Sequence, residues 1–237
     1  MWDIKAILKD FVKTKDIQQF INNRFSDKYE YKIIVSYEYK KNVMDIISSY
    51  KKYYMMTPNE AYQIYMAVKS TKKLLGDVAE VGVCHGGSAM IICEAKGNKK
   101  LHLFDTFEGL PDTCDIDKTN PSGVVFNKGD YCCSLENVRK NMKNYKDVYF
   151  YKGVFPETSE PIKDKLFSFV NLDVDLYKST LDCLQFFYPR MTRGGIIISH
   201  DYNVQSEGVK IAFDKFFQDK PEPIIELSGS QCLIVKT

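Results

Sequence analysis

The segment DVAEVGVCHGGS, residues 77–88, carries the most informative pattern in the sequence. Its first five residues predict a short strand, and glycines follow at positions 82, 86 and 87. Three glycines within six residues let the backbone pass close to a ligand, and the helix expected from residue 88 presents free N–H groups to an anion. The spacing is not G-x-G-x-x-G, so this turn alone does not identify the ligand.

Strands and helices alternate from this turn to the carboxyl terminus. Further strands are expected at residues 100–104, 147–151, 166–172 and 195–199, and helices near 88–95, 134–144, 179–188 and 205–217. Two final strands, 224–227 and 231–235, flank Ser228-Gly229-Ser230 as a hairpin. This order predicts an α/β fold with a doubly wound, mostly parallel seven-stranded sheet, Rossmann-like, that ends in a C-terminal antiparallel hairpin.

The first part of the chain has mainly helical periodicity. We expect an N-terminal helical extension or lid over residues 1–55 and one main domain over residues 56–237. The length of 237 residues suits a single three-layer α/β domain preceded by such an extension.

The composition predicts a soluble cytoplasmic protein. Hydrophobic residues make up 44% and charged residues 27%, and no apolar run approaches the ~20 residues of a membrane-spanning helix. The net charge of +2 is too small to argue for nucleic acid as a partner. Seven cysteines without metal-binding spacing, behind an amino terminus that does not read as a secretory signal, indicate reduced thiols.

Acidic residues and one histidine follow the predicted strands. Asp105 ends the second strand, where a carboxylate can accept both hydroxyls of a ribose. Asp173 follows the fourth strand, and His200 and Asp201 follow the fifth. Parallel strands bring these ends to one edge of the sheet, so the three side chains are expected to converge beside a nucleoside site. Such convergence predicts either a divalent metal or proton transfer.

Four motifs in a fixed order resemble the macrocin O-methyltransferase family of class I S-adenosylmethionine-dependent enzymes. They lie at residues 80–88, 105–111, 172–180 and 188–202, and the resemblance extends from about Met55 to the carboxyl terminus. The resemblance implies a class I methyltransferase fold, S-adenosylmethionine as cofactor and transfer of a methyl group to a hydroxyl of a small molecule. A sugar or sugar-containing metabolite is the acceptor that the family suggests.

The resemblance also implies roles for individual residues. Asp173 corresponds to a metal ligand that is also a proposed general base, and Asp201 corresponds to a second metal ligand. His200 stands where the family commonly has aspartate; an imidazole can still bind a divalent ion, but it suits Mg²⁺ less well than Mn²⁺. His200 is therefore expected as a third ligand or as a catalytic base beside Asp173. The residues implied for cofactor binding are Met56, Thr57, Glu80, Gly82, Val83, Ser88, Asp105 and Phe107.

Two other interpretations remain open from the sequence. A nicotinamide-dependent oxidoreductase would share the Gly-rich turn and Asp105, but it would leave Asp173 and Asp201 without a purpose. A nucleoside-binding protein without catalysis would keep the cofactor site and, through His200, lose the chemistry. The sequence also leaves open a homo-oligomer and the role of the long loop over residues 112–128, which we expect to be a substrate-side lid.

Overall fold

The computed structural model describes residues 40–118, 120, 123–202 and 206–237. The chain divides into two units between Ile46 and Ile47, and the second, residues 47–237, contains the whole sheet. Most of the predicted N-terminal extension, residues 1–39, lies outside the described residues.

A seven-stranded sheet forms the centre of the second unit, in the order β3-β2-β1-β4-β5-β7-β6. Strands β1 to β5 are parallel, and β7 pairs antiparallel with both β5 and β6. This confirms the predicted doubly wound fold with a C-terminal antiparallel pair. The strands are β1 (Asp77–Val81), β2 (Leu101–Asp105), β3 (Val148–Lys152), β4 (Phe167–Leu172), β5 (Met191–Ser199), β6 (Ile225–Glu226) and β7 (Cys232–Val235).

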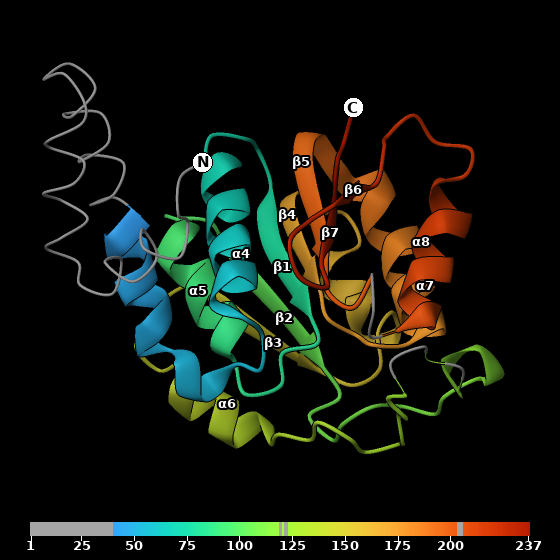
Figure 1. Cartoon of the computed structure of the whole chain (residues 1–237). Coiled ribbons are helices and arrows are strands. Elements are labelled where there is room, and N and C mark those ends of the chain that lie inside the picture. Colours follow the sequence, from blue (N-terminus) through green and yellow to red (C-terminus); the bar gives the residue numbers. More distant parts are fainter. Residues whose placement is uncertain (1–39, 119, 121–122, 203–205) are drawn as a thin grey trace, which may run out of the picture. The chain divides into compact units, whose positions relative to one another are not determined.

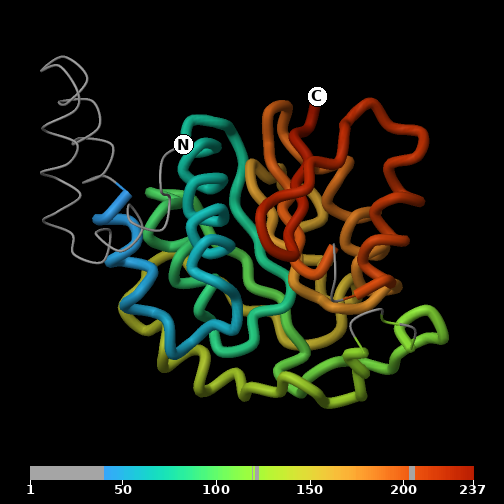
Figure 2. The backbone as a smooth tube through the Cα atoms, in the orientation of Figure 1, coloured from blue at the N-terminus to red at the C-terminus, as the bar shows by residue number. Residues whose placement is uncertain are grey.

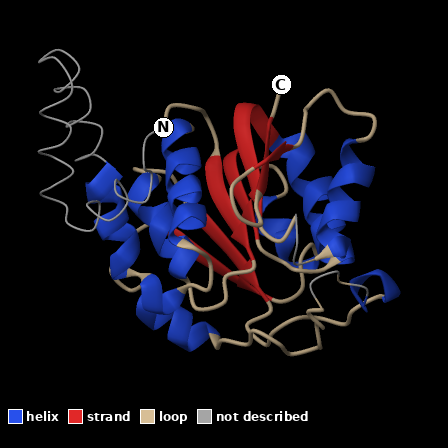
Figure 3. Ribbon diagram, in the orientation of Figure 1, coloured by secondary structure: helices blue, strands red, loops and turns tan. Residues whose placement is uncertain are grey.

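Helices cover both faces of the sheet, as Figures 1 and 3 show. Helices α4 and α5 pack together on one side, and α7 and α8 pack together on the other. The helices labelled in Figure 1 are α4 (Pro58–Ser70), α5 (Gly87–Ala95), α6 (Leu135–Asn141), α7 (Tyr177–Phe187) and α8 (Glu207–Phe217). Short 3₁₀ segments are η1 (Lys51–Tyr53), η2 (Asp115–Lys118), η3 (Glu157–Ile162) and η4 (Tyr188–Arg190).

The central strand β4 is buried along its whole length, which explains its continuous apolar run. Aromatic rings fill the space between the sheet and α7: Phe187 stacks on Phe155 at 5.2 Å and meets Phe167 edge-on at 5.1 Å between ring centroids. This core holds the carboxyl ends of the strands in fixed positions. None of the described helices is both long and apolar enough to cross a bilayer.

Candidate active site

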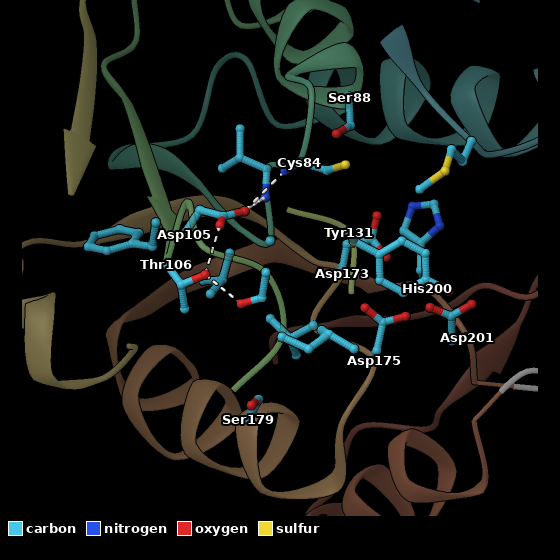
Figure 4. A pocket seen from close by; sticks show the side chains of 18 of the residues that line it. Cys84, Ser88, Asp105, Thr106, Tyr131, Asp173, Asp175, Ser179, His200 and Asp201 are labelled. Carbon is cyan, nitrogen blue, oxygen red and sulfur yellow. Dashed lines mark hydrogen bonds between the residues drawn. The ribbon is translucent and has the colours of Figure 1, made fainter. Parts of the chain in front are cut away.

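The loops that follow β1, β2, β4 and β5 line a cavity of about 370 Å³. These strands run parallel, so their carboxyl ends meet at one edge of the sheet. Figure 4 shows the converging side chains, with Asp105 and Thr106 on one side, Cys84 and Ser88 of the Gly-rich turn between, and His200 and Asp201 on the other side. Residues far apart in the sequence therefore share one site.

Two glycines are required in the turn after β1. Gly82 has a φ of +84°, and a Cβ on it would overlap the carbonyl oxygen of Asp173. A Cβ on Gly87, at the start of α5, would lie 2.5 Å from the carbonyl oxygen of Tyr53. The first contact packs the turn directly against the end of β4, which brings the predicted cofactor loop next to Asp173.

Asp105 connects the loops after β1 and β2. One carboxylate oxygen accepts hydrogen bonds from the backbone N–H groups of Val83 at 2.7 Å and Cys84 at 3.0 Å. The other oxygen accepts from the N–H of Phe107 at 2.6 Å. Bonds to a charged acceptor are stronger than neutral ones, so this side chain orders both loops (Figure 4).

The structure places most of the predicted cofactor residues on the cavity wall. Those that line it are Met56, Gly82, Val83, Ser88 and Asp105. Thr57, Glu80 and Phe107 are not among the lining residues. Thr57 is the N-cap of α4, and Phe107 is only 3% exposed beneath its loop. Thr57 and Phe107 therefore support the segments that line the cavity without lining it themselves.

Glu80 lies fully buried at the base of the Gly-rich turn. The Nδ2 of Asn171 on β4 donates to its carboxyl group at 2.8 Å. Burial raises the pKa of Glu80 to about 8, against the opposing effect of hydrogen bonds from Ser88 and Asn171. Glu80 therefore links β1, β4 and the start of α5 beneath the cavity.

Asp173, His200 and Asp201, from two neighbouring strand ends, meet at the other end of the cavity. Burial raises the pKa of Asp173, while the nearby imidazole of His200 opposes that rise. Burial and the charge of Asp173 raise the pKa of Asp201 to about 7. This arrangement can hold a proton or donate a hydrogen bond near neutral pH.

Asp175 is a cavity residue that the predicted site lacked. Its backbone turns at a φ of +57°, and its side chain lies next to that of Asp201 in Figure 4. Burial and the adjacent charges of Asp201 and Asp173 raise its pKa well above the ordinary value. No local pattern indicated this, because the position of the side chain depends on the left-handed turn at Asp175 after β4 ends.

His200 is held by a residue from the final hairpin. Its Nε2 meets the amide nitrogen Nε2 of Gln231 at 2.8 Å, and Gln231 is fully buried. Across the described residues, no three His, Cys, Asp or Glu side chains are placed to hold one metal ion. The predicted metal ligands Asp173, His200 and Asp201 therefore line one cavity, but their side chains are not arranged to coordinate a common ion.

The loop between β2 and α6 also contributes to the cavity. Asp130 and Tyr131 line it from this loop. Buried Asp117, in the segment predicted to be a lid, accepts a hydrogen bond from the N–H of Tyr177 at 2.8 Å and so caps the start of α7. The loop is anchored at this point, and Figure 2 shows its green tube running beneath the sheet edge. The sequence offered no motif for these contacts.

The sheet order, the antiparallel final pair and a cavity at the strand ends define the class: this is the class I methyltransferase fold. The family model for macrocin O-methyltransferase (TylF) matches residues 53–230. The chain belongs to the macrocin O-methyltransferase family.

Curated relatives and a solved structure support this membership. The chain is 31% identical over 168 residues to the 8-demethyl-8-(2,3-dimethoxy-alpha-L-rhamnosyl)-tetracenomycin-C 4'-O-methyltransferase of Streptomyces olivaceus, an alignment that covers 65% of this chain and 64% of that protein. It is 29% identical over 141 residues to the demethyldecarbamoylnovobiocin O-methyltransferase of Streptomyces niveus, with coverage of 54% and 53%. The alignments thus span about half to just under two thirds of those relatives.

The solved O-methyltransferase NovP has the same fold, with a TM-score of 0.67 and 26% identity. The match covers 78% of this chain and 82% of NovP. The fold similarity therefore extends over most of both chains.

Proposed function

We propose that this protein is an S-adenosylmethionine-dependent O-methyltransferase that acts on a hydroxyl of a small molecule. One observation carries the proposal: a single cavity joins the Gly-rich turn and Asp105 to Asp173 and His200. A donor site and a group able to take a proton from an alcohol thus lie within reach of each other.

The residues at the first end of the cavity fit S-adenosylmethionine. Neither Gly82 nor Gly87 could carry a side chain without a clash. Both line the cavity, so a ligand beside them would contact the backbone. The Asp105 oxygen that accepts from Phe107 has one further contact, the Thr106 hydroxyl at 3.4 Å. That hydroxyl donates at a shorter 2.6 Å to the carbonyl of Gly109, so a ribose hydroxyl can take its place at Asp105. The acidic lining also suits a sulfonium cation.

We assign cofactor contacts accordingly. Gly82, Val83 and Ser88 would surround the methionine part, and Asp105 would hold the ribose. Met56 would cover the cofactor from the amino-terminal side. Thr57, Glu80 and Phe107 would act indirectly, by capping α4 and supporting the two loops from beneath.

Asp173 is our candidate for the general base. When bound, S-adenosylmethionine supplies the methyl group, and the acceptor oxygen must lie in line with the bond that breaks. Such positioning contributes up to ~7–11 kcal/mol, and a general base adds about 10²–10⁴-fold. Because burial raises the pKa of Asp173, its carboxylate is a stronger proton acceptor than one in water.

The predicted metal does not fit the present arrangement. The Nε2 lone pair of His200 is already engaged by the amide N–H of Gln231. Burial and the charges of neighbouring carboxyl groups raise the pKa of both Asp175 and Asp201, so a proton can balance the charge of this pair. We therefore assign the proton transfer to the protein's own side chains.

A hydroxyl on the sugar of a glycosylated metabolite is the acceptor that we propose. The Streptomyces olivaceus relative is named for methylating a rhamnosyl-tetracenomycin, and a Micromonospora griseorubida relative that is 30% identical over 145 residues is named mycinamicin III 3''-O-methyltransferase. The exposed ring of Tyr131 at the cavity offers an apolar face to such a sugar or aglycone.

Two assays test the proposal. Calorimetry with S-adenosylmethionine and with NAD⁺ should show binding of the first alone; binding of NAD⁺ alone would favour an oxidoreductase. Methyl transfer from labelled S-adenosylmethionine to a panel of glycosylated natural products should follow. Cofactor binding without transfer to any hydroxyl on the panel would favour the non-catalytic nucleoside-binding protein.

A further inference from the structure

We infer that Gln231 is a positioning residue that fixes His200 as a hydrogen-bond donor toward the cavity and leaves Asp173 to take the proton from the acceptor. The inference rests on the proposed methyl transfer, and it resolves which of the two candidate bases acts.

The sheet places Gln231 opposite His200. In the antiparallel pair of β5 and β7, Ser199 is the partner of Cys232, so the next pair outward is His200 and Gln231. The N–H of Tyr202 bonds to the carbonyl of Ser230 at 2.8 Å and continues the same ladder. The contact between the two side chains therefore follows from the register of the strands.

The hydrogen bond determines the tautomer of the imidazole. The amide nitrogen of Gln231 can only donate, so Nε2 of His200 is the acceptor in their 2.8 Å contact. In a neutral ring the proton then resides on Nδ1. His200 is 5% exposed and lines the cavity, whereas Gln231 is fully buried and does not. The Nδ1–H group is therefore the hydrogen-bond donor of His200 that is available to the cavity.

A donor at this position complements Asp173. Asp173 and His200 both line the cavity and are labelled side by side in Figure 4. A ring whose Nε2 accepts and whose Nδ1 donates has no free lone pair. It therefore takes neither the acceptor's proton nor a metal ion, and the carboxylate of Asp173 remains as the proton acceptor.

The cost of burying Gln231 supports a specific role for its amide. Its Oε1 is buried and finds no hydrogen-bond partner among the described residues. An unsatisfied buried polar group costs about 1–3 kcal/mol, which an apolar side chain of similar size would avoid. Burial and packing alone therefore do not account for an amide at this position.

The direct test is ¹⁵N NMR of the imidazole rings in the intact protein. The sequence has only three histidines, so a His200→Gln spectrum identifies the His200 signals by their loss. We expect Nδ1 of His200 to be protonated and Nε2 unprotonated at neutral pH. A protonated Nε2 with a bare Nδ1 would overturn the inference, whether or not the protein methylates anything.

Gln231→Glu tests the consequence for catalysis. A carboxylate can only accept, so the ring proton should move to Nε2 and kcat should fall about 10–100-fold, while the KM for S-adenosylmethionine changes less than about threefold. Gln231→Met removes the donor without adding charge and should give mixed tautomers and a smaller loss. Unchanged kcat in Gln231→Glu despite a switched tautomer would refute the role.

The matched control is Gln63→Glu. Gln63 lies on α4, donates to the carbonyl of Ser228 at 3.0 Å in the same hairpin region, and does not line the cavity. It should keep the wild-type tautomer and kcat. Absence of methyl transfer in the wild type would instead count against the proposed function, and the NMR result would still stand alone.

Discussion

At the scale of single residues, Asp105 combines a structural and a binding role. Its carboxylate accepts three backbone N–H groups and thereby holds two loops in register at the strand ends. The fourth acceptor position faces the Thr106 hydroxyl at 3.4 Å, a long contact that a ligand hydroxyl can replace. A residue that both builds a site and contacts its ligand should be sensitive to any substitution.

We predict that Asp105→Ala weakens binding of S-adenosylmethionine about 10–100-fold, because hydrogen bonds to a charged group contribute about 1.5–3 kcal/mol. Calorimetry measures this directly, with Glu108→Ala as control, since Glu108 is exposed and paired with Lys152 at the surface. Wild-type affinity in Asp105→Ala would remove this residue from the cofactor site.

Metal removal is a second prediction at this scale. Since Nε2 of His200 is engaged by Gln231 and burial raises the pKa of Asp201, exhaustive dialysis against a chelator should leave methyl transfer within about twofold of the untreated rate. Loss of activity that Mg²⁺ or Mn²⁺ restores would show that the side chains rearrange around an ion.

At the scale of elements, the start of α4 is joined to the hairpin between β6 and β7. Glu60 forms a capping box with Thr57, and its other oxygen accepts from the N–H and hydroxyl of Ser230 at 2.8 and 2.9 Å. Ser230 precedes Gln231 directly. The helix that opens beside the cavity and the strand that positions His200 are therefore linked through one carboxylate.

We predict that Glu60→Ala lowers the free energy of unfolding by about 2–4 kcal/mol, because the cap and the buried bonds to Ser230 are lost together. Denaturant unfolding gives the value. Glu136→Ala, at the exposed first turn of α6, should cost well under 1 kcal/mol. Equal effects of the two substitutions would mean that the link between α4 and the hairpin does not matter.

The elements also show what a sequence pattern can and cannot predict. The apolar runs of β4 and β5 and the glycines after β1 predict the sheet and its binding edge. The beginning of β5 at Met191, four residues earlier than expected, was hidden by its polar residues, which are partly exposed. The pairing of His200 with Gln231 depends on the register of β5 with β7, and no local pattern encodes that register.

At the scale of the whole molecule, one buried carboxylate binds the chain just after the last strand, β7. Glu222 accepts from Lys236 at 2.7 Å and from Tyr188 at 2.8 Å, and it is 3% exposed. Burial alone would raise its pKa, but these hydrogen bonds outweigh burial and lower the pKa of Glu222 to about 2.

Stability should therefore depend on pH through Glu222. A carboxyl whose pKa is lower in the folded protein stabilises it above the unfolded value of about 4.3, and this contribution disappears as the pH falls toward 2. We predict that Glu222→Gln costs about 2 kcal/mol at pH 7 and little at pH 2.5, as measured by urea unfolding. A constant difference across that range would contradict the assignment.

Asp173→Asn tests the central claim most directly, because the substitution keeps the size of the side chain and removes its ability to take a proton. Measured side by side with the wild type, the variant should bind S-adenosylmethionine within about threefold while methyl transfer to the best acceptor falls by about 10²–10⁴-fold. Methyl transfer at the wild-type rate would contradict the account, because the group meant to activate the alcohol would then be dispensable.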